Sequence, residues 1–173
     1  MYIDLRVNRE QMAHTQEVQL VFKVDEFFRR SKSGAIWGTI YFENSEGMAF
    51  PDKGWTDIVA GFLRAWLNAL VRMADGISST ESVAFYDGPM DVELSTSGGG
   101  IVQLVFLRRE VPQFAAEQNM AHLLSSSVTL AETLLKACEE HGWQNADTVA
   151  VTSSLKNCKS LVSGLSPKPL TGE

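Results

Sequence analysis

The spacing of apolar residues changes along this chain from period two to periods three and four, and this change constrains the fold most. Residues 17–24 (EVQLVFKV) alternate apolar and polar side chains with one exception, which is typical of a half-buried strand. Residues 55–71 instead repeat apolar side chains at helical spacing. Because both patterns occur in one chain of 173 residues, we expect strands and helices to share one core.

The strands are predicted mainly in the first two thirds of the chain. Alternating or β-branched segments at 2–7, 17–24, 35–42, 81–86, 90–95 and 101–107 are the expected strands. A Gly-rich segment at 97–100 separates the last two, and it is predicted to be a hairpin turn rather than a phosphate-binding loop, since no lysine follows it. The order of these strands favours a meandering antiparallel sheet.

Three helices are expected. The first covers 56–75, with Thr56 as N-cap, Asp57 in the first turn and Gly76 as terminator. The second covers 114–141, with the serines at 125–127 as a candidate break, and the third covers 147–163, starting at Asp147. No good strand is expected after residue 112.

These elements predict an α+β fold. We expect a single α+β domain over 1–163 and a flexible C-terminal tail over 164–173. The sheet should contain about six strands. A central helix should lie between strands 3 and 4, and the C-terminal helices should pack on one face of the sheet.

The charge distribution argues against several classes of partner. The net charge is −6, and the longest basic cluster is Arg29, Arg30 and Lys32, so nucleic-acid binding is not expected. The most apolar stretch contains Arg64 and Arg72, which favours a buried amphipathic helix over a membrane span. With no secretion signal at residues 1–10 and only two cysteines, we expect a cytoplasmic protein.

Two residue pairs have the spacing of a reactive site, but each lacks the further residues that such a site requires. Ser153 and Lys156 match a serine–lysine nucleophile pair, without the other elements of such enzymes. Cys138 and His141 lie three residues apart, although a zinc site needs more ligands than these two. We therefore predict no catalytic residue, no metal ligand and no cofactor. A small enzyme or ligand-binding domain stays open as an alternative.

Acidic residues gather in two predicted loops. An acidic group of this kind can be a solvated rim, a helix cap, a contact with a partner protein or a site of acid–base chemistry. For Asp57 we favour a role in the first turn of the predicted helix. The candidate partner-binding residues are Glu43, Glu46, Asp52, Asp87 and Asp91. Trp37, Trp55 and Trp66 are expected mostly in the core, but a tryptophan near a loop could anchor a partner.

Residues 50–57 (FPDKGWTD), followed by Phe62, Trp66 and Leu70, provide a family resemblance. The segment resembles a turn that opens a tryptophan-bearing helix in small bacterial immunity proteins, which are encoded beside polymorphic or contact-dependent toxins. The resemblance implies a protein that binds a cognate toxin and occludes its active site. It identifies no binding residue. An adaptor or chaperone for a secreted effector is the alternative, and the oligomeric state stays open.

Overall fold

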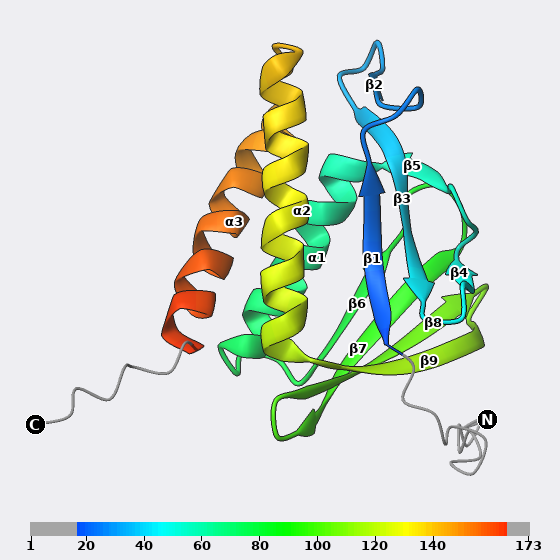
Figure 1. The fold of residues 1–173 in the computed structure, drawn as a ribbon, viewed down its shortest axis with the longest axis vertical. Helices are drawn as coiled ribbons and strands as arrows, with labels where there is room; N and C mark the ends of the chain where they lie inside the picture. The colour runs from blue at the N-terminus through cyan, green and yellow to red at the C-terminus, as the bar shows by residue number, and fades with distance from the viewer. Residues whose placement is uncertain (1–16, 166–173) are drawn as a thin grey trace, which may run out of the picture.

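The computed structural model describes residues 17–165, which form an α+β fold of two antiparallel sheets and three helices (Figure 1). The fold class expected from the sequence is therefore confirmed. The strands are β1 (Val18–Lys23), β2 (Arg29–Arg30), β3 (Ile36–Asn44), β4 (Ala49–Phe50), β5 (Thr56–Ile58), β6 (Thr80–Ala84), β7 (Met90–Gly98), β8 (Ile101–Arg108) and β9 (Val111–Asn119). The helices are α1 (Val59–Ala74), α2 (Met120–Glu140) and α3 (Ala146–Leu165).

The strands do not form the single sheet that the sequence suggested. β3 is the centre of a five-stranded sheet in which β1, β2, β4 and β5 all pair with it antiparallel. β6, β7, β8 and β9 form a separate four-stranded meander. The side-chain amide of Gln118 on β9 joins the two sheets by donating a 2.7 Å hydrogen bond to the carbonyl oxygen of Val18 on β1.

The core lies between the two sheets and α1. The Phe42 ring from β3 lies 5.0 Å from the Phe106 ring of β8 and 5.2 Å from the Trp66 ring of α1, measured between centroids. Phe50 from β4 lies 5.3 Å from the same Phe106 ring. Helices α2 and α3 pack against α1 and against each other, on the same side of the sheets (Figure 1). The aromatic cluster therefore links both sheets to one side of α1, while α2 and α3 cover its other side.

The first helix begins later than predicted. Residues 56–58 form β5, and α1 starts at Val59 without a side-chain cap, so the predicted roles of Thr56 and Asp57 in the helix are wrong. Thr56 pairs with Thr39 of β3, because the free edge of β3 offers these backbone groups a ladder partner. The predicted terminator Gly76 is confirmed: its N–H donates to the carbonyl oxygen of Met73.

A strand takes the place of the first turns predicted for the second helix. β9 covers Val111–Asn119, and its pairing with β8 outweighs the helical spacing of its apolar residues. The side chain of Asn119 then caps α2 by accepting hydrogen bonds from the N–H groups of Ala121 and His122. α2 is continuous through the serines at 125–127, so the candidate break is absent.

The third helix also differs at its start. Asn145 precedes α3, and its side chain accepts a 2.8 Å hydrogen bond from the N–H of Thr148, while the Thr148 hydroxyl lies 3.0 Å from the N–H of Asn145. This reciprocal pair is a capping box, so Asn145 replaces Asp147 as the cap. α3 extends through Leu165, two residues into the predicted tail. The predicted strand at 2–7 and residues 166–173 of the tail lie outside the described residues.

Within residues 17–165, every helix is too short or too polar to span a bilayer.

Candidate functional site

Asp57 joins the two acidic loops that the sequence singled out. Its buried carboxylate accepts hydrogen bonds from the backbone N–H groups of Ile58 (2.6 Å), Tyr86 (3.0 Å) and Asp87 (3.2 Å). The indole N–H of Trp55 adds a fourth, at 3.4 Å. Loop 51–57 and turn 85–90 therefore meet at one place, which the sequence alone could not show.

Asp57 is a positioning residue rather than a reactive one. Burial raises the pKa of its carboxyl above the ordinary value, because desolvation disfavours the charged form, and the N–H donors offset this only in part. Its relative exposure is 0%, so a partner or substrate cannot touch it. The carboxylate instead fixes the backbone of the turn that follows β6.

Tyr86 is the exposed aromatic residue that this turn presents. Half of its surface faces solvent (50%), yet its ring packs against α1 at Gly61, where a Cβ would lie 3.0 Å from two ring carbons. Its hydroxyl lies 3.4 Å from Nη2 of Arg64, which also pairs with Asp147 at 3.4 Å. The ring is therefore held in one position while much of it stays accessible.

Two of the predicted partner-binding residues already have counterions. Glu43 accepts a 2.9 Å hydrogen bond from Lys53, and this hydrogen bond and the charge of Glu43 raise the pKa of Lys53. Asp52 lies 3.2 Å from Nη2 of Arg108, which also donates to the carbonyl oxygen of Pro51 at 2.7 Å. These contacts reduce the net negative charge that loop 43–57 offers to a partner.

The other three carboxylates form no ion pair with another described residue. Asp87 is exposed directly beside Tyr86, and Asp91 is half-buried on β7, next to the Met90 that pairs with Arg108. Glu46 is exposed in the turn after β3, away from Asp57. The structure thus places Asp87 directly beside Tyr86, Asp91 opposite Ala84 on the outward face of β7, and Asp52 at Arg108, and it leaves Glu46 apart.

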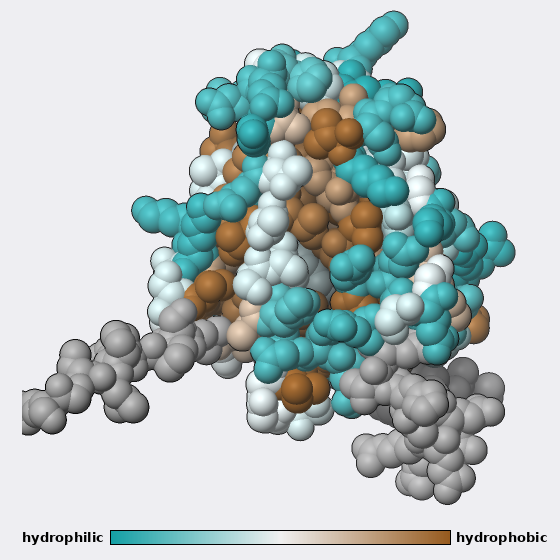
Figure 2. All heavy atoms as spheres, viewed as in Figure 1, coloured by the Kyte–Doolittle hydropathy of each residue, from teal (hydrophilic) through white to brown (hydrophobic). Residues whose placement is uncertain are grey.

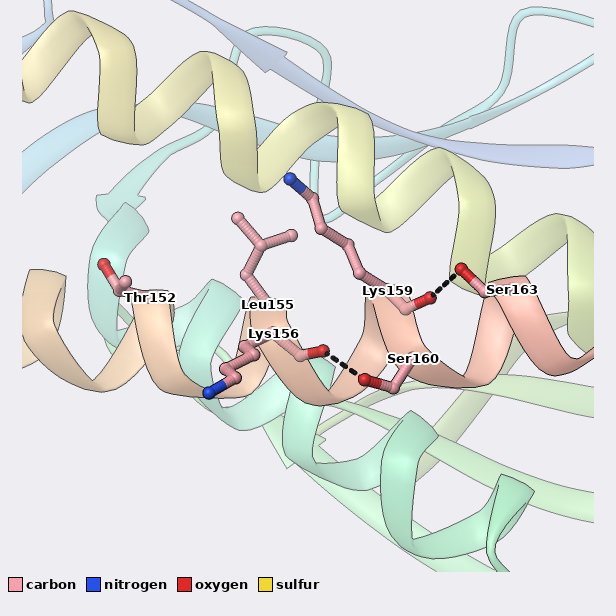
Figure 3. A pocket seen from close by; sticks show the side chains of 6 residues that line it. All are labelled: Thr152, Leu155, Lys156, Lys159, Ser160 and Ser163. Carbon is pink, nitrogen blue, oxygen red and sulfur yellow. Dashed lines mark hydrogen bonds between the residues drawn. The ribbon is translucent and has the colours of Figure 1, made fainter.

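A shallow hollow runs along α3, but its hydroxyl groups and Lys159 already have partners within the protein (Figure 3). The hydroxyl of Ser160 donates to the carbonyl oxygen of Lys156, and the ammonium group of Lys159 lies 2.5 Å from Glu132 of α2. Ser153, the candidate nucleophile, donates its hydroxyl to the carbonyl oxygen of Val149. The lining residues come from one helix, so the hollow has no opposite wall: Thr152, Leu155, Lys156, Lys159, Ser160 and Ser163.

The two cysteines are free and buried. Burial raises the pKa of Cys138 and of Cys158 to about 11, so the reactive thiolate is scarce at neutral pH. Nδ1 of His141 lies 2.8 Å from the carbonyl oxygen of Ala137, at the end of α2. Residues 17–165 contain no group of three or more potential metal ligands.

The chain matches no protein-family model, no curated protein and no solved structure. The site is therefore defined by its geometry alone. The sequence analysis did not identify Tyr86 and Gly61. A tyrosine at the end of a strand and a glycine inside a helix are ordinary in the sequence, and their contact appears only in the folded protein. Asp57 itself was singled out in the sequence, but it was assigned to the first turn of the helix rather than to a contact with turn 85–90.

Proposed function

We propose that this protein is an immunity protein that binds a cognate toxin domain in the cytoplasm and occludes its active site. The observation that carries the proposal is the exposed ring of Tyr86, packed on α1 at Gly61, beside the exposed acidic residue Asp87. Tyrosine is enriched among residues that dominate protein interfaces, and a side chain ordered before binding loses little entropy.

The charge of the protein supports a basic partner. A net charge of −6 attracts a positively charged domain from a distance, and nuclease toxins are basic because they bind phosphate backbones. Inhibition then requires only a complementary surface, so the proposal assigns no enzymatic activity to this chain.

Removing the Tyr86 ring tests the proposed anchor. We expect Tyr86→Ala to weaken toxin binding by about 2 kcal/mol or more, roughly thirtyfold in Kd, because an interface anchor is lost. Isothermal titration against the toxin domain encoded by the neighbouring gene measures this.

Gly61→Ala provides the matched variant. The added methyl group displaces the ring while alanine favours the helix, so binding should weaken with the melting temperature nearly unchanged. If both variants bind like the wild type, Tyr86 is not the anchor. If no neighbouring toxin binds the wild type, the immunity proposal fails.

Charge reversal tests the acidic loop separately. We expect the double variant Glu46→Lys and Asp52→Lys to weaken toxin binding at low salt, mainly through a slower association rate, and to leave folding nearly unchanged. The control is Glu139→Lys with Glu140→Lys on α2, which changes the net charge equally at another place. Stopped-flow association rates at two salt concentrations measure the effect. Equal slowing by both double variants would mean that only the overall charge matters.

A further inference from the structure

A second exposed surface lies at the end of the molecule that carries β2, at the top of Figure 1. We call residues 24–35 the basic tip; it consists of the loop 24–28, β2 and the turn into β3. Figure 2 shows that hydrophilic side chains cover this end. The basic tip does not include Tyr86, and the inference about it does not rest on the proposed function. The two surfaces meet near the start of α3, where Asn145 binds Gly34 of the tip and Asp147 pairs with the Arg64 that lies beside Tyr86.

The basic tip is positively charged in an otherwise acidic chain. Residues 24–35 contain three basic and two acidic side chains, whereas the whole chain has a net charge of −6. Arg29 and Arg30 are exposed, and neither they nor Lys32 form an ion pair with another described residue. One of the two carboxylates, Asp25, is occupied by the hydroxyl of Thr39 at 2.8 Å. Asp25 and the exposed Glu26 lie in the same loop, but neither forms an ion pair with Arg29, Arg30 or Lys32.

Apolar side chains accompany these charges. Val24 and Phe27 are 48% and 50% exposed. Trp37, which was expected in the core, is half-buried on the outward face of β3, with the Arg29 guanidinium 6.0 Å from its ring centroid. Aromatic residues and arginine are enriched among the residues that contribute most of the binding energy of protein interfaces.

The fold holds the basic tip in a fixed position. Phe28 is buried with its ring centroid 5.2 Å from that of Trp143, in the connection between α2 and α3. From the same connection, the side-chain amide of Asn145 donates a 2.8 Å hydrogen bond to the carbonyl oxygen of Gly34. Gly34 has φ +91°, which other residues rarely adopt, so this turn is specified by the sequence. A surface held in this way loses little entropy on binding.

We propose that the basic tip binds an acidic segment of a partner protein, whose carboxylates meet Arg30 and Lys32 and whose apolar side chains cover Phe27. The complementary charge selects an acidic partner, and the exposed Val24 and Phe27 select one that also offers apolar contacts. A nucleic acid fits less well. Arg29 already covers a face of Trp37, and the rest of the chain repels phosphates.

The test uses the full chain and a fluorescein-labelled peptide in which glutamates flank leucine and phenylalanine, with fluorescence polarisation as the readout. We expect binding that weakens with salt. The double variant Arg30→Glu and Lys32→Glu should weaken it about tenfold or more at low salt. Phe27→Ala should weaken it several-fold without changing the salt dependence, since only an apolar contact is lost.

The matched control is Lys136→Glu with Lys156→Glu, which makes the same change of net charge on exposed positions of α2 and α3. This control should bind the peptide like the wild type. The proposal is overturned if the control loses as much affinity as the tip variant, or if Phe27→Ala has no effect. It is also overturned if the peptide does not bind at low salt, or if labelled oligothymidine binds more tightly. Toxin binding by the same variants is a separate measurement, so the two proposals can fail independently.

Discussion

Trp66→Ala is expected to destabilise this protein by about 3–5 kcal/mol, a large part of the total stability of a domain. Trp66 lies in the middle of α1 with no exposed surface, and its ring stacks on Phe62 and meets Phe42 edge-on. Alanine leaves a large cavity between α1, β3 and α2, which these rigid aromatic neighbours cannot fill. Urea unfolding followed by circular dichroism measures the loss. An unchanged midpoint would contradict the burial of this side chain.

Two further substitutions separate the destabilisation caused by the cavity from that caused by losing the Trp66 hydrogen bond. The indole N–H of Trp66 donates to the Ser127 hydroxyl at 2.9 Å, in a fully buried pair that links α1 to α2. Ser127→Ala leaves this N–H unpaired and should cost about 1–3 kcal/mol. Trp66→Phe in the Ser127→Ala background removes both partners. We therefore expect the two changes to be non-additive, and additivity would show that the hydrogen bond contributes nothing.

Asp57→Ala is expected to cost about 2–4 kcal/mol, because the backbone N–H groups of Ile58, Tyr86 and Asp87 lose their acceptor. The turn that presents Tyr86 should loosen, and amide hydrogen exchange at Tyr86 and Asp87 should accelerate. The neighbouring variant Asp87→Ala is the control. Its side chain is exposed, so its free energy of unfolding should change by less than about 0.5 kcal/mol. If the two variants are equally stable, Asp57 does not tether the turn.

The pH dependence of stability provides an independent test of Asp57. Its pKa is raised in the folded state, so between the ordinary value of 3.8 and the raised value the folded protein binds more protons than the unfolded chain. The contribution of Asp57 to stability is thus greatest at low pH and falls as the pH rises through the folded pKa. Asp57→Asn does not titrate. The free energy of unfolding of the wild type minus that of this variant should therefore fall from low to neutral pH. A rise of this difference would contradict the raised pKa.

The candidate site shows where reasoning from sequence was sufficient and where it was not. The acidic residues of both loops were identified because acidic side chains gather in two predicted loops. Their pairing was not, because Lys53 and Arg108 reach Glu43 and Asp52 only once β3, β4 and β8 are assembled. For the same reason the exposed Tyr86 ring went unnoticed, since the helix surface that supports it is distant in the chain.

Local periodicity by itself determined the fold class, most strands, the buried stripe of α1 and the Gly-rich hairpin, because each depends on side chains within a few residues of one another. Tertiary structure decided between strand and helix where hydrogen bonding to a neighbouring strand competed with a locally helical spacing of apolar residues. Residues 56–58 and 111–119 both have helical spacing nearby, yet each lies along a free strand edge, of β3 and of β8 respectively. Unpaired edge groups are costly when buried, so the ladder prevailed over the helix at both places, and it thereby placed Asp57 beneath the turn that carries Tyr86.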